Sequence, residues 1–174
     1  MQLGRTQRLA DDSAFNVLNK HCLDENGRIS LPLDTVEVAR RLGIGLEWDD
    51  DPNMSSERSG YSQLDSEGKP KIFVNPKQGR ERMRFTVAHE IGHIYRAMCD
   101  GTIDQLVPHD RAELATQGTD DDEIYANTFA AELVMPEAIV RRWVEEAVPF
   151  TKLMARFGVS KSALTNRLNN LELA

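Results

Sequence analysis

The sequence predicts an α+β fold that is mainly helical and contains one small antiparallel sheet. Apolar residues recur at helical spacing in most segments, which is typical of amphipathic helices packed on a core. Only three short stretches, 44–48, 60–64 and 71–75, read as strands. The 174 residues, 40% of them hydrophobic, are enough for one domain with a small appendage.

Two helices are expected before the first strand. Apolar residues between about Arg8 and Lys20 predict a short helix, and residues 24–27 predict a turn. Asp34 is a typical N-cap for a second helix, which Gly43 ends. The alternating stretch 44–48 then predicts the first strand.

The next segment predicts a solvated loop followed by a hairpin. The acidic run 49–51 and Pro52 favour a loop over a metal site. Residues 60–64 and 71–75 flank a polar turn around Gly68, which favours two paired strands. Together with the first strand they form an about three-stranded antiparallel sheet.

A helix with the sequence RFTVAHEIGHIY is expected over residues 84–95, and it holds an HExxH pattern. His89 and His93 are four residues apart, so both imidazoles lie on one helix face and can bind one metal ion. Glu90 lies beside that face, where a carboxylate can take a proton from a zinc-activated water. Such a pattern also arises by chance, so a third ligand has to decide between a zinc site and a solvated histidine pair. Gly92 predicts close approach by another segment.

The third ligand candidate, Glu123, begins a second helix with the sequence EIYANTFAAEL. Asn127 follows one turn later, where its side chain can accept the free ring N–H of a ligand histidine. The alternative for Glu123 is a carboxylate favoured by the helix dipole, which is also our interpretation of residues 120–122. Paired with the HExxH helix and Asn127, Glu123 is expected to bind the metal.

RFTVAHEIGH followed by EIYANTFAAELVMP resembles the ImmA/IrrE family of small bacterial and phage zinc metallopeptidases, which are gluzincin-like. The resemblance runs from about residue 35 to 171. It implies Zn²⁺ held by His89, His93 and Glu123, with Glu90 as the catalytic carboxylate. It also implies a sheet over the HExxH helix, with an edge strand that pairs with an extended peptide.

The resemblance further implies an endopeptidase whose substrate is a helix-turn-helix transcriptional repressor. Cleavage of the repressor would switch on phage, mobile-element, defence or stress genes. The alternative class is a non-catalytic metal-containing sensor or a DNA-binding transcriptional regulator. A closed zinc site with four protein ligands would favour that alternative.

Cys99 and His109 each have two interpretations. A thiolate is a good zinc ligand, so Cys99 could fill the open position in a latent state, or it could be a buried, inert thiol. His109 could hydrogen-bond the transition state, or it could be a surface histidine. Asp122 and His109 are the next ligand candidates if Glu123 does not bind the metal.

The C-terminal segment is expected to form a helix-turn-helix-like subdomain, 149–174, packed on a metallopeptidase domain, 1–148. Residues 151–170 hold four basic residues and no acidic one. Two positions depart from the DNA-binding pattern: Met154 replaces a small residue, and Arg167 replaces an apolar one. Packing support or repressor docking is therefore favoured over DNA binding.

Charge and composition limit the partners and the cellular compartment that are expected for this protein. The formal net charge of −7 argues against whole-surface nucleic-acid binding. No run reaches the roughly 20 apolar residues of a membrane-spanning helix, and the first residues do not form a secretory signal. The two cysteines do not make a disulfide framework, so a reducing cytoplasm is expected.

Overall fold

The structure, a computed structural model, describes residues 4–49, 59–106 and 120–174. The elements in chain order are α1 (Arg5–Val17), the π-helical turn η1 (Leu18–Cys22), α2 (Thr35–Arg41), β1 (Gly45–Trp48), β2 (Gly60–Leu64), β3 (Pro70–Val74), α3 (Arg80–Asp100), the 3₁₀ turn η2 (Ile103–Gln105), α4 (Asp120–Val134), α5 (Glu137–Glu145), α6 (Phe150–Phe157) and α7 (Lys161–Asn170). The fold is α+β and mainly helical, as predicted. None of the described helices combines the length and the apolar composition needed to span a bilayer.

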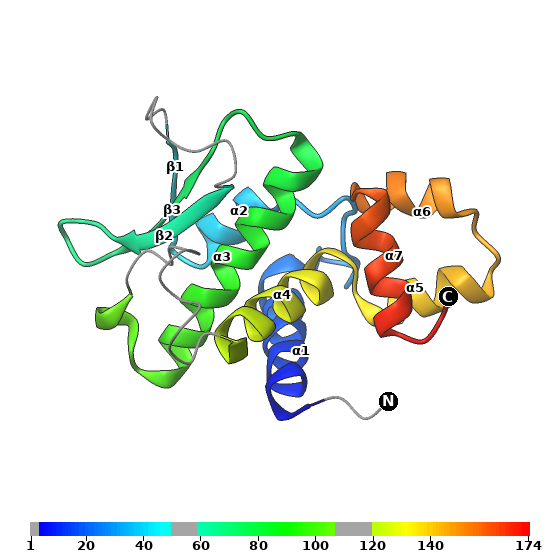
Figure 1. Cartoon of the computed structure of the whole chain (residues 1–174), viewed down its shortest axis with the longest axis horizontal. Helices are drawn as coiled ribbons and strands as arrows, with labels where there is room; N and C mark the ends of the chain where they lie inside the picture. The colour runs from blue at the N-terminus through cyan, green and yellow to red at the C-terminus, as the bar shows by residue number, and fades with distance from the viewer. Residues whose placement is uncertain (1–3, 50–58, 107–119) are drawn as a thin grey trace.

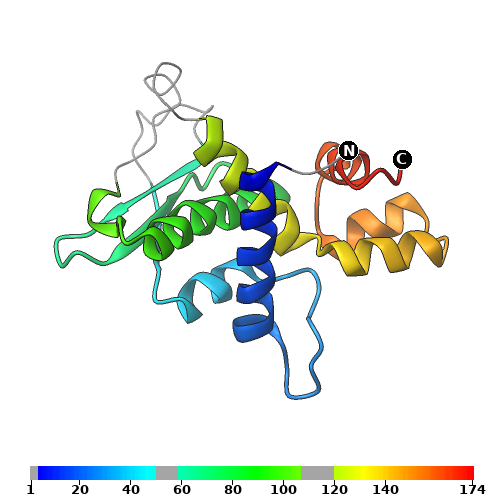
Figure 2. The same cartoon turned by 90° about the horizontal axis from the view of Figure 1, so that it is seen from below.

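Helix α3 is the central element of the molecule. The sheet lies on one side of it, and α4 lies on the other with α1 behind (Figure 1). The view from below shows α1 and α2 on the opposite side of α3 from the sheet (Figure 2). The buried apolar residues at this centre include Ile91 and Ile94 of α3 and Phe129 and Leu133 of α4. The core therefore immobilises the two helices that carry the predicted metal ligands.

The sheet has the order β1-β3-β2 and is mixed, which corrects the prediction of an antiparallel sheet. Strands β2 and β3 form the expected antiparallel hairpin, with Ser62 opposite Ile72. Strand β1 pairs with the other edge of β3 and runs parallel to it, with Leu46 opposite Ile72. Alternation tells which face of a strand is buried but not which strand lies beside it. Strand β2 is consequently an edge strand, and it lies against α3.

The N-terminal cap of α2 follows the predicted signal, and a glycine ends α6. Asp34 caps α2 by accepting hydrogen bonds from the backbone N–H groups of Val36 and Glu37. Gly158 takes a left-handed conformation with φ 62°, which ends α6 and lets the chain turn into α7. Helices α5, α6 and α7 lie together at one end of the molecule, and we call them the C-terminal lobe (Figure 1). The boundary at residue 148 stays a prediction.

Two predictions fall on residues that the structure does not describe. The acidic run 49–51 lies largely outside the described residues; only Asp49 is described, and its backbone N–H donates to Val74 O. His109 also lies outside the described residues.

Candidate metal centre

The two histidines of the HExxH pattern lie one turn apart on the face of α3 that meets α4. The Nε2 atoms of His89 and His93 are 3.0 Å apart. The side chain of His93 is 4% exposed and that of His89 is 12% exposed, so solvent reaches the pair mainly from the His89 side. The helix thus presents two imidazole nitrogens to one point near the surface.

Glu123 completes the group from α4. Its Oε1 lies 3.3 Å from His93 Nε2, and its Oε2 lies 3.7 Å from His89 Nε2. Helix α4 can come this close because Gly92 has no side chain: a Cβ there would lie 3.1 Å from Ala126 Cα. The close approach that the glycine predicted is confirmed.

Asn127 determines which way His89 faces. Its Oδ1 lies 3.1 Å from His89 Nδ1. An amide oxygen can only accept, so Nδ1 carries the hydrogen and Nε2 keeps its lone pair on the side of Glu123. This outer contact is the kind that orients metal-binding histidines.

The donor set fits a zinc ion. Ligand atoms of His89, His93 and Glu123 all lie within 4.8 Å of one another. Corners of a tetrahedron with bonds of about 2.0–2.2 Å are about 3.3–3.6 Å apart, and the separations here run from 3.0 to 3.7 Å. Two imidazoles and one carboxylate are a common protein contribution to catalytic zinc sites.

Glu90 lies outside this group and faces the sheet. It is 7% exposed, and its Oε2 accepts a hydrogen bond of 2.8 Å from Ser62 Oγ of β2. Sequence reasoning did not single out Ser62. Ser62 is 1% exposed and lies opposite the fully buried Ile72, where an apolar residue is usual, but the sequence alone does not reveal this pairing.

Arg96 is a second residue that sequence reasoning missed. Its guanidinium lies 2.8 Å from Asp122 Oδ1 and donates to Asp121 O at 3.0 Å. It also lies over the ring of Tyr125, 5.0 Å from the centroid. Arg96 therefore ties the end of α3 to the start of α4, next to Glu123. Asp122, the reserve ligand candidate, is engaged in this ion pair.

The structure does not bring Cys99 to the metal ligands. Cys99 is exposed near the end of α3 and is absent from the group of ligand atoms found among the described residues. Six residues of helix place it roughly 9 Å along the axis from His93 and about 240° around it. Desolvation of the sulfur also raises the pKa of the Cys99 thiol, which disfavours the thiolate that binds metals.

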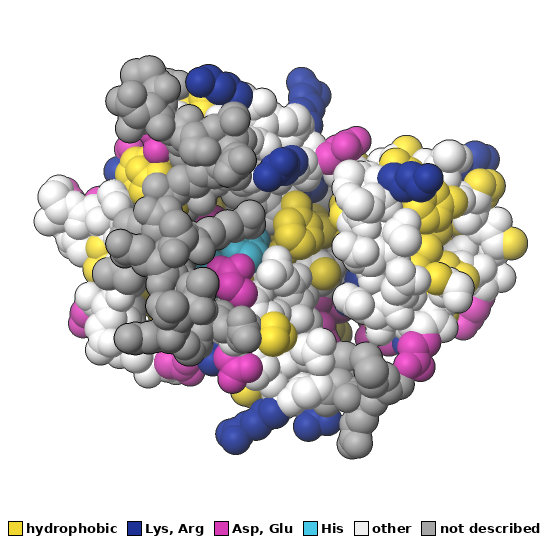
Figure 3. All heavy atoms as spheres, in the orientation of Figure 1, with side chains coloured by type: hydrophobic (Ala, Val, Ile, Leu, Met, Phe, Trp, Pro, Cys, Tyr) yellow, Lys and Arg dark blue, Asp and Glu magenta, His cyan; other side chains and the backbone are white. Residues whose placement is uncertain are grey.

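Among the described residues, Figure 3 shows histidine surface beside acidic surface near the middle of the molecule. Glu123, whose side chain is 36% exposed, is the most accessible member of the group.

A helix with two histidines one turn apart, joined by a glutamate from the next helix, defines a metallopeptidase-like domain. The model of the peptidase M78 family, described as the IrrE N-terminal-like domain, matches residues 39–169. This match spans most of the sequence, and the chain belongs to that family, as the resemblance indicated.

Among solved structures, the chain is similar to a transcriptional regulator of Mycobacterium tuberculosis, with a TM-score of 0.60 and 19% sequence identity. The alignment covers 95% of this chain and 47% of that one, so the chain spans about half the length of the regulator. At this identity the likeness establishes a shared fold. A search of curated proteins gave no match.

Proposed function

We propose that this protein is a zinc-dependent endopeptidase that cleaves a helix-turn-helix transcriptional repressor, which derepresses phage, mobile-element, defence or stress genes. The observation that carries the proposal is the juxtaposition of His89, His93 and Glu123 with a separate carboxylate, Glu90. The family supports peptidase chemistry, and the resemblance stated above supports the repressor as substrate. The free cysteines, Cys22 and Cys99, suit a reducing cytoplasm, which we propose as the compartment.

Each residue has a distinct role in this mechanism. When bound, zinc polarises a carbonyl oxygen and lowers the pKa of water to about 7. Glu90 acts as general base towards the attacking water and then returns the proton to the leaving amine. Ser62 holds Glu90 in place by its hydrogen bond, and Asn127 holds His89. The edge strand β2 offers backbone groups to an extended peptide.

The proposed base can be tested without disturbing the metal ligands. Glu90→Gln keeps the side-chain shape and can still accept a hydrogen bond from Ser62, but it cannot take a proton. We expect peptide cleavage to fall by about 10²–10⁴-fold, the usual worth of proton transfer by a positioned side chain. Zinc content by elemental analysis and the melting temperature should stay close to those of the wild type.

The competing idea of a DNA-binding regulator makes the opposite forecast. Lys161 is exposed at the start of α7, so it is the charge to remove. Arg167 is unsuited to that test because it is 5% exposed and paired with Glu132. If Glu90→Gln still induces the target genes at the wild-type level and Lys161→Ala does not, the peptidase proposal is wrong and the DNA-binding regulator is favoured.

A further inference from the structure

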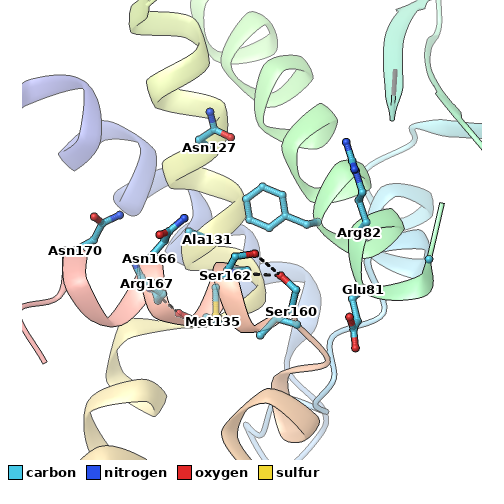
Figure 4. Close-up of a pocket in the computed structure, with 14 residues that line it drawn as sticks. Glu81, Arg82, Asn127, Ala131, Met135, Ser160, Ser162, Asn166, Arg167 and Asn170 are labelled. Carbon is cyan, nitrogen blue, oxygen red and sulfur yellow. Dashed lines mark hydrogen bonds between the residues drawn. The ribbon is translucent and has the colours of Figure 1, made fainter. Parts of the chain in front are cut away.

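A groove separates the C-terminal lobe from the metal-binding helices. It has a volume of about 580 Å³ and lies between α3, α4 and α7. Apolar side chains from all three helices line it, among them Phe85, Ala131, Met135 and Ala163. Figure 4 shows Ala131 of α4 close to Ser162 and Asn166 of α7, with Glu81 and Arg82 of α3 farther to the right. The size is that of a site for a small ligand or a few peptide residues.

This groove continues directly from the metal centre. Phe85 lies one helical turn before His89 on α3, and Ala131 lies one turn after Asn127 on α4, so these residues extend the faces that carry the site. Asn127 belongs to both places, because it contacts His89 and also lines the groove. Figure 3 shows hydrophobic surface next to the histidine surface, towards the C-terminal lobe.

The polar side chains around the groove are mostly uncharged. Asn127 lies on α4, and Asn166 and Asn170 lie on α7. An amide side chain offers both donors and an acceptor, as a peptide backbone requires. The one cation that α7 contributes, Arg167, is neutralised by its ion pair with Glu132. Glu81 and Arg82 of α3, which carry opposite charges, also line the groove. An apolar lining with three asparagine amides fits a peptide with an uncharged side chain.

We propose that this groove receives the substrate residues on one side of the cleaved bond and accommodates a bulky apolar side chain there. Helix α7 is its outer wall, so the C-terminal lobe selects the peptide. The inference rests on the proposed peptidase function. The inference also gives a function to the side of α7 that carries Asn166 and lines the groove.

Two asparagines of α7 make a matched test. Asn166 and Asn169 are both exposed, but only Asn166 lines the groove. Asn166→Trp should fill the groove, whereas Asn169→Trp adds the same side chain elsewhere on the helix. Tryptophan and asparagine have similar helix propensities, so both variants should keep their zinc and their melting temperature.

The probe is a library of synthetic peptides that tile bacterial helix-turn-helix repressors, incubated with zinc-loaded protein, with the cuts identified by mass spectrometry. We expect the wild type and Asn169→Trp to prefer a bulky apolar residue at one position beside the cut. Asn166→Trp should lower kcat/KM for those peptides by about 10-fold or more, mainly through KM, and shift the preference to small residues.

Two results would contradict the inference, and they differ in meaning. If the wild type cuts the library and Asn166→Trp cuts it with an unchanged profile, the groove is not a subsite, while the peptidase proposal stands. If zinc-loaded wild type cuts no peptide, the peptidase proposal fails and the subsite fails with it.

Discussion

Neighbouring residues of the HExxH pattern face different parts of the structure, because each residue along a helix is rotated by about 100° from the previous one. His89 and His93 face α4, where Glu123 meets them. Glu90, one residue on from His89, faces β2 and contacts Ser62. The proposed base is thus held by a different element from the one that completes the metal site. The two functions can therefore be separated by substitution.

Asn127 should matter for the metal although it does not bind it. Asn127→Ala removes the acceptor for His89 Nδ1, so the imidazole loses the contact that sets its tautomer. We expect zinc affinity or activity to fall by about 10- to 100-fold, as is usual for such outer contacts. Competition with a chelator of known affinity measures this. Asn169→Ala, which changes an exposed asparagine far from His89 in sequence, is the control; equal affinities in all three proteins would remove Asn127 from the site.

At the scale of elements, the contact between α3 and α4 sets the geometry of the site. Gly92 is buried there, and a Cβ would lie 3.1 Å from Ala126 Cα and 3.2 Å from Phe129 Cδ1. The ring can shift slightly, but the backbone of Ala126 is held by its own helix. Because Glu123 and Asn127 are on α4, any widening at Gly92 moves both of them away from the histidines.

Gly92→Ala is accordingly expected to destabilise the protein. Alanine gains about 1 kcal/mol in helix propensity, whereas overpacking a core typically costs about 1–3 kcal/mol. We expect a net loss of up to about 2 kcal/mol in the free energy of unfolding, measured by urea denaturation, together with weaker zinc binding. Gly79→Ala is the control for zinc binding: an added Cβ there meets nothing within 4 Å, so zinc affinity should not change, although loss of a favourable N-cap residue of α3 lowers stability. If Gly92→Ala is more stable than the wild type and binds zinc equally well, then α3 and α4 have room for a methyl group at this contact.

At the scale of the whole molecule, a buried charge cluster joins the C-terminal lobe to the body. Arg167 of α7 pairs with Glu132 of α4 and donates from Nε to Met135 O at 3.1 Å. Asp11 of α1 lies beside this pair, and its Oδ1 is buried without a hydrogen-bond partner among the described residues. Burial raises the pKa of Asp11 to about 6, because the effect of desolvation outweighs the opposing effect of the Arg167 charge.

This pKa shift predicts a pH-dependent stability. Between the usual pKa of 3.8 and about 6, the folded protein keeps a proton on Asp11 that the unfolded chain has released. The free energy of unfolding therefore falls as pH rises through this window, and the loss is complete above it. Asp11→Asn cannot titrate, so its stability relative to the wild type should rise between pH 4.5 and pH 7.5. We expect an increase on the order of 1–2 kcal/mol, because a pKa unit corresponds to about 1.4 kcal/mol and Asp11 is partly exposed.

Thermal melts of both proteins across this range provide the measurement. Asp12→Asn is the control, because it removes an exposed carboxyl group from the same helix. Its difference from the wild type should change with pH much less than that of Asp11→Asn. A difference between Asp11→Asn and the wild type that is constant with pH would mean that Asp11 is ionised throughout.

The sequence by itself determined the elements of this protein and the set of residues at its candidate metal centre. Helices, caps and the hairpin depend on residues a few positions apart, so periodicity, Asp34 and Gly43 were sufficient to predict them. The pairing of His89 with His93 has the same local origin. Glu123 and Asn127 were also predictable, because a three-ligand site requires a partner helix and that helix has the matching one-turn spacing.

Only the tertiary structure decided which surfaces meet. It placed β1 parallel to β3, brought Ser62 to Glu90, kept Cys99 away from the metal ligands, and buried Arg167 against Glu132. Ser62 and Glu90 are 28 residues apart and Glu132 and Arg167 are 35 apart. Contacts over such distances depend on how helices and strands pack, because an ion pair or hydrogen bond imposes no periodic pattern on the chain between its partners. The groove beside the metal centre arises from the same cause, since three separate helices line it.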